Sequence, residues 1–187
     1  MQGQRNLRHM RVKAVLGRTL SRLAREKQLA DAVDTHEPCP SDYWPPEPGY
    51  APSAKEKAAK QPRADLLVKG GPNGVQLLDL VITHPNATTI QKAATVPGAA
   101  AQRAGDSKER LYSRRWRVPE GDFVPFAVET GGRLDARARA FLASFVCMCI
   151  GKPRKEFTKE DLKWYARAMR ELMDSVTVAS PSRPPLC

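Results

Sequence analysis

Two aspartates stand inside apolar stretches of this chain, and they limit how it can fold. Asp65 lies in the run Ala-Asp-Leu-Leu-Val, and Asp79 lies in the run Leu-Leu-Asp-Leu-Val-Ile. The segment 70–74 between them has the sequence Gly-Gly-Pro-Asn-Gly, in which Gly-Pro and Asn-Gly are strong turn signals. The pattern predicts an antiparallel hairpin with strands near 64–69 and 75–83.

A carboxylate on a mostly buried strand is unfavourable unless a proton, a cation or a metal ion compensates its charge. Two carboxylates on neighbouring strands would also repel each other, and a shared divalent metal relieves this repulsion. Many nucleases use such a metal to polarise a phosphate and to generate hydroxide. If Asp65 and Asp79 hold a metal, we expect their carboxylates to converge on a common point. The alternative is that both aspartates face water at strand ends or are satisfied by backbone and arginine donors.

The chain is strongly basic, with a formal net charge of +11 and a pI near 9.8. Much of the excess lies in the N-terminal segment, which carries Arg5, Arg8, Arg11, Lys13, Arg18, Arg22, Arg25 and Lys27. Such a field suits a polyanion, either nucleic acid or an acidic membrane surface, although a solvated helix face has the same pattern. The residues expected to bind nucleic acid are Arg11, Arg18, Arg22 and Arg25, with Lys152, Arg154 and Lys155 of a basic turn.

Several other classes of protein do not fit the composition. No apolar run approaches the length of a membrane span, and the N-terminus carries no secretory signal pattern. The 4 cysteines lack zinc-ligand spacing, which predicts reduced thiols, and the 3 histidines show no two-histidine metal spacing. We therefore expect an intracellular protein, nuclear if its source is eukaryotic, that does not bind membranes.

The chain divides into five expected segments. They are a basic N-terminal helix of the core at 1–33, a proline-rich loop at 34–63, an α/β core at 64–150, a C-terminal helix at 151–178 and a disordered tail at 179–187. Within the loop, the aromatic residues Tyr43, Trp44 and Tyr50 are the ones expected to pin it to the core.

Apolar periodicity predicts the remaining elements. Helices are expected at 5–29, 98–116 and 134–149 and after a Thr158 cap, and a third strand at 123–129. Residues 105–107, Gly-Asp-Ser, should interrupt the second helix, with Asp106 and Glu109 capping a fresh start. The stripe expected on the last helix is Leu162, Tyr165, Ala166, Met169, Leu172, Met173 and Val176. This order predicts an α/β fold with a central mixed sheet, made of the hairpin and a further strand, flanked by helices.

Lys108 is a basic residue that could lie close to the two strand aspartates. Helical spacing places it in one stripe with Ala104, Leu111 and Tyr112, so it should face inward. A lysine there could snorkel to water or could meet the strand carboxylates. Together with the two aspartates and Glu37, which follows the first helix, it completes a set of three acids and one ammonium.

This set, in this order on these elements, resembles the restriction-endonuclease-like superfamily, the PD-(D/E)XK phosphodiesterases. The resemblance implies a core made of a helix, a meander of strands, a crossover helix and a further strand. It implies that Asp65, Asp79 and Glu37 are the catalytic acids and bind the metal. Val81 holds the position of the usual lysine, and because some members recruit that lysine from the following helix, Lys108 is expected to replace it.

A domain of eukaryotic retroelement-type open reading frames is similar over residues 8–146. Its features are an Arg-His pair entering a helix, a Glu, Asp-containing strands with a trailing His-Pro, a Lys-x-x-x-Tyr helix and a Phe-x-Pro-Phe-x-x-Glu-Thr-Gly-Gly-Arg string. Here they stand at Arg8-His9, Glu37, Asp79 to Pro85, Lys108 to Tyr112 and Phe123 to Arg133. Within the last string, Glu129 and Arg133 are candidates for supporting the site. The alternative for Glu129 is that it caps the following helix or pairs with an arginine.

Three functions are compatible with these features. The first is a metal-dependent DNA phosphodiesterase of the endonuclease type, derived from a retroelement, with Mg²⁺ or Mn²⁺ as cofactor and DNA as partner. Lys108 would then orient the nucleophile or balance developing charge. The second is an inactive nuclease fold that only binds nucleic acid, and it is favoured if Lys108 points away from Asp79. The third is a protein-interaction scaffold whose aspartates are partners in buried salt bridges.

Overall fold

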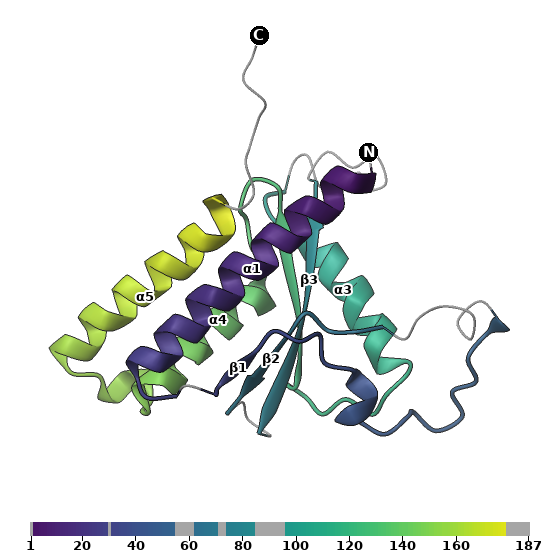
Figure 1. Cartoon of the computed structure of the whole chain (residues 1–187), viewed down its shortest axis with the longest axis horizontal. Coiled ribbons are helices and arrows are strands. Elements are labelled where there is room, and N and C mark those ends of the chain that lie inside the picture. The colour runs from purple at the N-terminus through teal and green to yellow at the C-terminus, as the bar shows by residue number, and fades with distance from the viewer. Residues whose placement is uncertain (1, 30, 55–61, 71–73, 85–95, 179–187) are drawn as a thin grey trace, which may run out of the picture.

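The computed structural model describes residues 2–29, 31–54, 62–70, 74–84 and 96–178 (Figure 1). Its helices are α1 (Gln2–Glu26), η1 (Pro40–Asp42), α3 (Ala99–Ser113), α4 (Ala136–Ile150), η2 (Arg154–Glu156) and α5 (Lys159–Val178). Its strands are β1 (Val33–Asp34), β2 (Leu66–Lys69), β3 (Val75–Thr83) and β4 (Phe123–Glu129). The predicted α/β class is confirmed. The predicted tail at 179–187 lies outside the described residues.

The strands form one mixed sheet in the order β1-β2-β3-β4. The first two pairs are antiparallel, and β3 and β4 are parallel. The predicted hairpin is therefore confirmed, with Leu66 opposite Leu78. Strand β1 was not predicted, because two residues are too short to show an alternating pattern.

Helix α3 supplies the connection between the parallel strands β3 and β4. Parallel neighbours cannot be joined by a tight turn and need a crossover, usually a helix. Since the crossover packs on the sheet, α3 covers the face on which Asp79 lies. The order of helix, antiparallel meander, crossover helix and parallel strand is the one expected from the sequence.

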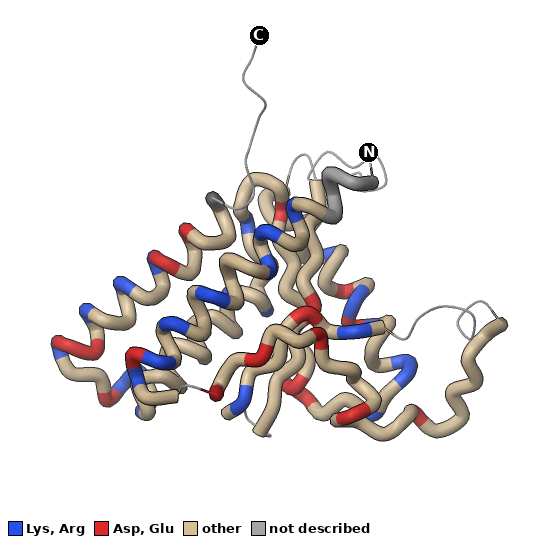
Figure 2. Tube along the Cα trace, in the orientation of Figure 1, with Lys and Arg blue, Asp and Glu red and all other residues tan. Residues whose placement is uncertain are grey.

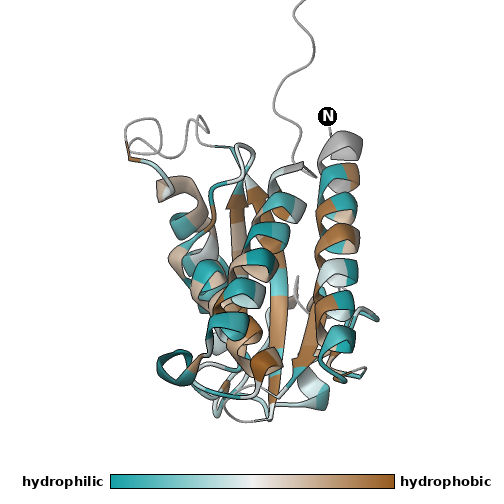
Figure 3. Ribbon diagram, turned by 90° about the vertical axis from the view of Figure 1, so that its left-hand side faces the viewer, coloured by the Kyte–Doolittle hydropathy of each residue, from teal (hydrophilic) through white to brown (hydrophobic). Residues whose placement is uncertain are grey.

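Each face of the sheet has its own core. On one face the alternate strand residues pack against α1, α4 and α5, and on the other a smaller cluster joins α3 to the proline-rich loop. Figure 3 shows the hydrophobic strands in the middle of the molecule with helices to either side. The two faces of β3 therefore meet different helices, which decides the partners of each aspartate.

Helix α1 begins earlier and ends earlier than predicted. On one face of the helix Val12, Leu16, Leu20 and Leu23 are buried, and Val15 is half-buried. Figure 1 shows α5 running alongside α1. Gly17 lets the helix approach the sheet, since a Cβ at this position would lie 3.0 Å from Thr35 Cγ2.

The predicted interruption of α3 at residues 105–107 is wrong, because the helix runs unbroken through Gly105. The glycine serves packing, since a Cβ there would lie 2.5 Å from Nη2 of Arg137. Asp106 and Glu109 do not cap a new helix but form ion pairs with Arg137. The Gly-Asp-Ser sequence suggested a helix break, whereas the glycine is explained by Arg137, which is distant in the sequence and packs against it.

The capping box of α5 is confirmed. The Asp161 amide donates to Thr158 Oγ1 at 3.2 Å, and the Thr158 amide donates to Asp161 Oδ2 at 2.9 Å. The predicted apolar stripe is confirmed for Leu172 and Val176, which are buried, and for Tyr165, Met169 and Met173, which pack against the core. It is wrong for Leu162, which is 46% exposed, and for Ala166, which is also exposed. Ala168, which was not predicted, is buried on the same helix.

One of the three loop aromatics anchors the proline-rich segment. Trp44 is buried and meets Phe123 edge-to-face at 6.4 Å between ring centroids. Tyr50 is half-buried, whereas Tyr43 is 40% exposed and does not pin the loop. Residues 55–61 of this loop lie outside the described part of the chain. Among the helices that the structure describes, none is long and apolar enough to cross a membrane.

Candidate active site

Asp79 occupies the middle of β3 and is only 5% exposed. Its Oδ2 accepts a hydrogen bond from the Lys108 ammonium at 2.8 Å, so the predicted contact between these two residues is confirmed. Burial raises the pKa of Asp79 above its ordinary value, and the Lys108 charge opposes this effect without cancelling it. The site thus holds a carboxylate whose ionised form is disfavoured by burial, next to a half-buried ammonium that faces the sheet.

Tyr112 adds a buried hydroxyl next to Asp79. Its ring stacks on Phe123, with centroids 4.0 Å apart and planes inclined by 19°. Burial raises the pKa of Tyr112, and the Asp79 charge adds to the effect. The hydroxyl lies close enough to Asp79 to lower the pKa of that carboxyl by hydrogen bonding, although the geometry falls outside strict hydrogen-bond limits. Tyr112 is therefore a second donor directed at Asp79, beside the Lys108 ammonium.

Asp65 directly precedes β2 and is held at the edge of β3. Its Oδ2 accepts from the Leu80 amide at 2.8 Å, and His9 Nε2 lies 3.1 Å from the same oxygen. The Lys13 ammonium lies 3.7 Å from Oδ1. Burial alone would raise the pKa of Asp65, but the His9 hydrogen bond, the Leu80 amide and the nearby positive charges lower it. Asp65 is therefore a well-compensated carboxylate, in contrast to Asp79.

His9 is the site residue that pattern analysis missed. Its Nε2 lies 3.1 Å from the Leu80 carbonyl as well as from Asp65. The hydrogen bond to Asp65 raises the pKa of His9 despite the opposing effect of burial. The only sequence signal was the Arg-His pair entering the first helix, because metal spacing between histidines gave no reason to select it.

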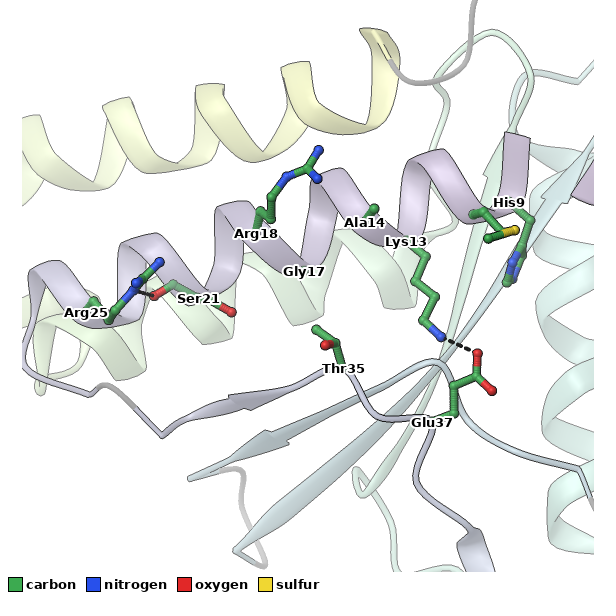
Figure 4. Close-up of a pocket in the computed structure, with 10 residues that line it drawn as sticks. His9, Lys13, Ala14, Gly17, Arg18, Ser21, Arg25, Thr35 and Glu37 are labelled. Carbon is green, nitrogen blue, oxygen red and sulfur yellow. Dashed lines mark hydrogen bonds and ion pairs between the residues drawn. The ribbon is translucent and has the colours of Figure 1, made fainter. Parts of the chain in front are cut away.

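Glu37 is drawn toward α1 instead of toward the aspartates. Its Oε1 accepts from the Lys13 ammonium at 2.6 Å, a contact marked in Figure 4. The same ammonium approaches Asp65, so one positive charge lies between the two carboxylates. Glu37 adopts a left-handed backbone, with φ of 56°, which turns the loop after β1 beneath the helix.

The two aspartates meet different layers of the fold. Asp65 contacts residues of α1, whereas Asp79 contacts Lys108 of α3. They are near enough that the charge of Asp65 contributes to the raised pKa of Asp79. Convergence of both on one metal ion stays a prediction.

The donor chemistry suits magnesium only in part. Asp65 and Asp79 offer the carboxylate oxygens that Mg²⁺ prefers, and this ion usually binds one or two carboxylates and keeps several waters. Among the described residues, however, no group of three or more His, Cys, Asp or Glu side chains is arranged to hold a metal ion. The aspartate pair therefore fits a hydrated ion, while Glu37 is placed in an ion pair instead.

Glu129 caps a helix, though not the one suggested by the sequence. It is 2% exposed, and its Oε1 accepts from the Ala100 amide at 3.2 Å, in the first turn of α3. The following helix α4 is capped by Asp135, which accepts from the Arg137 amide at 2.6 Å. Arg133 is exposed, and its carbonyl accepts from the Glu129 amide. Glu129 thus supports the crossover helix that carries Lys108.

The basic residues fall into paired and unpaired groups. Arg22 forms ion pairs with Glu26 and Glu171, and Lys152 pairs with Asp161 at 2.6 Å. Arg154 lies over the Tyr165 ring at 4.9 Å. By contrast, the exposed residues Arg11, Arg18 and Lys155 form no ion pair with any residue described, and Arg25 only donates to the Ser21 carbonyl. Figure 2 shows basic positions recurring along α1.

Comparison with protein-family models, with curated proteins and with solved structures finds no match to this chain.

Proposed function

We propose that this chain is a metal-dependent phosphodiesterase domain that cleaves nucleic acid, with DNA as its substrate. The observation that carries the proposal is the 2.8 Å contact between the Lys108 ammonium and Asp79. Nuclease chemistry of the expected kind needs an ammonium beside a strand carboxylate, and the usual strand position is occupied by Val81. The crossover helix supplies this ammonium from the adjacent layer.

The arrangement of elements supports the same proposal. A helix, an antiparallel meander, a crossover helix and a parallel strand follow in the order that the resemblance to restriction-endonuclease-like enzymes implies. Asp65 and Asp79 stand on the second and third segments of that meander. A domain of retroelement origin that acts on nuclear DNA is consistent with these features and with the basic charge.

Asp65 and Lys108 would have different roles in the reaction. Asp65 stays ionised because His9 and the Leu80 amide hold it, so it offers a fixed negative charge at the edge of β3. Lys108 would balance negative charge that develops on the phosphate or orient the attacking water, an electrostatic contribution that is strongest where water is excluded. A bound Mg²⁺ would supply Lewis-acid activation and a water of lowered pKa.

The second candidate is an inactive nuclease fold that binds nucleic acid. It is favoured by the Lys13 ammonium, which lies 2.6 Å from Glu37 and 3.7 Å from Asp65. A cation already compensates these carboxylates, so the fold does not need a metal there for stability. The two candidates differ in whether metal ions promote cleavage.

Plasmid nicking during a titration with Mg²⁺ or Mn²⁺ tests the proposal. The wild type should convert supercoiled DNA to the open circle only with metal, and Asp79→Asn should abolish conversion. Asp174→Asn is the matched control, because Asp174 is an exposed carboxylate on α5. Absence of nicking by the wild type with either metal, on duplex and single-stranded substrates, would favour the inactive fold.

A further inference from the structure

A groove of about 550 Å³ runs along α1. Figure 4 shows its lining: α1 contributes residues from His9 to Arg25, and the segment after β1 contributes Thr35 and Glu37 on the opposite wall. Lys13 crosses the groove to reach Glu37. Because His9 and Lys13 line the groove and both contact Asp65, one end of the groove lies next to this carboxylate.

The charges that line this groove are unevenly compensated. Arg18 and Arg25 are exposed, and neither forms an ion pair within the described part of the chain. On the same helix, Arg22 is held by Glu26 and Glu171 of α5, and Lys27 lies over the Trp164 ring. The cations toward α5 thus serve helix packing, while those at the groove are available to a ligand.

The two available cations, Arg18 and Arg25, are seven residues apart on α1, which returns them to the same side of the helix. Over this distance the helix rises about 10 Å at 1.5 Å per residue. In one strand of B-form geometry this length corresponds to about three phosphates at 3.4 Å each. A duplex presents two backbones to a protein, whereas a single row of cations matches one backbone. The hydroxyls of Ser21 and Thr35, which also line the groove, are neutral donors suited to phosphate oxygens.

We infer that this groove binds the backbone of a single nucleic-acid strand, with phosphates on Arg18 and Arg25, and leads it to the site formed by Asp65 and Asp79. The direction of the strand rests on the proposed function, but binding in the groove does not. Glu37 marks the end of the binding stretch, since its carboxylate repels phosphate while Lys13 holds it in place.

Binding without metal tests the inference separately from cleavage. The probe is a fluorescent oligothymidylate of about eight nucleotides, long enough to span the row, titrated in EDTA at several salt concentrations. Replacing both Arg18 and Arg25 by Ala should weaken binding about tenfold at low salt. It should also reduce the slope of log affinity against log salt by roughly 1.4, since each single-strand phosphate contact contributes roughly 0.7.

Two further variants separate the groove from the general positive field. Arg139→Ala with Arg170→Ala removes the same charge from exposed positions outside the groove, and it should retain most of the affinity. Ala14→Trp fills the groove without changing charge and should weaken binding as strongly as the arginine variant. Thermal unfolding of each variant verifies that it is folded.

Three results would overturn the inference. They are equal losses in the two double-arginine variants, wild-type affinity in Ala14→Trp, and stronger competition by a duplex than by the same number of single-strand phosphates. If the protein binds single strands in this way but does not nick DNA, the groove inference stands and the catalytic proposal fails. Metal-dependent nicking that is unaffected by loss of both arginines would keep the catalytic proposal and remove the inferred path from the groove to the site.

Discussion

The ammonium of Lys108 lies 2.8 Å from Oδ2 of Asp79, although 29 residues separate them in the chain. The pair joins the crossover helix to the central strand at a point where burial makes an ionised carboxylate unfavourable. Substituting either residue therefore tests a relationship that is both structural and, under the proposed function, catalytic.

Lys108→Met should leave the fold intact and reduce metal-dependent cleavage by about 10²–10³-fold, because the methionine keeps aliphatic packing and removes the charge. Single-turnover nicking rates at saturating metal measure the effect. Lys163→Met, at an exposed position of α5, is the control and should cleave like the wild type. A silent Lys108→Met variant in an active enzyme would show that the lysine takes no part in the chemistry.

Asp79→Asn should raise the melting temperature at neutral pH. Burial raises the pKa of Asp79, so the folded protein holds this proton more tightly than the unfolded chain. The wild type therefore loses stability as pH rises from about 3.8 through the folded pKa, and the cost persists at pH 7. The asparagine avoids this cost, and each kcal/mol gained corresponds to about 2–4 °C.

Melting curves of wild type and Asp79→Asn at pH 7 and below pH 3.8 provide the measurement, and the difference should shrink at acidic pH. Asp174→Asn controls for loss of a surface carboxylate. A lower melting temperature for Asp79→Asn at neutral pH would mean that pairing with Lys108 outweighs the burial cost.

His9 should make stability depend on pH in the neutral range. The hydrogen bond to Asp65 raises its pKa above the ordinary 6.5, so its stabilising contribution is complete below pH 6.5. That contribution disappears as pH rises through the folded pKa. Urea unfolding across this range should show the wild type losing stability relative to His9→Gln. His36→Gln, at a side chain 92% exposed, should follow the wild type. Parallel curves for wild type and His9→Gln would refute this linkage.

The effect of Gly105→Ala on the free energy of unfolding should depend on Arg137: a loss in the wild type and a gain when Arg137 is replaced by alanine. In the wild type the new methyl displaces Arg137, which separates this guanidinium from the buried Asp135 carboxylate and lowers stability. In an Arg137→Ala background the closest obstacle is removed and only Asp135 Oδ2, at 3.2 Å, still lies near the new methyl. The higher helix propensity of alanine should then add up to about 1 kcal/mol to the free energy of unfolding. Free energies of urea unfolding for the four proteins of this cycle measure the effect. A gain of similar size in both backgrounds would mean that the glycine has no packing role.

The local pattern of the sequence predicted elements whose signals lie within a few residues. The hairpin was predictable because its turn chemistry and apolar runs are adjacent, and the α5 cap because Thr158 and Asp161 are three apart. The inward position of Lys108 was also predictable, since helical spacing alone places it beside Tyr112.

The tertiary structure decided which groups meet. Asp65 and His9 are 56 residues apart, and their contact depends on how α1 packs against the edge of β3, which no periodicity specifies. Gly105 suggested a helix break until Arg137, from another helix, was found against it. The sequence alone determined which residues prefer the interior and which local elements they form. Layer packing determined that Asp65 is compensated by α1 and Asp79 by α3, because side-chain partners across layers are set by three-dimensional distance rather than by spacing along the chain.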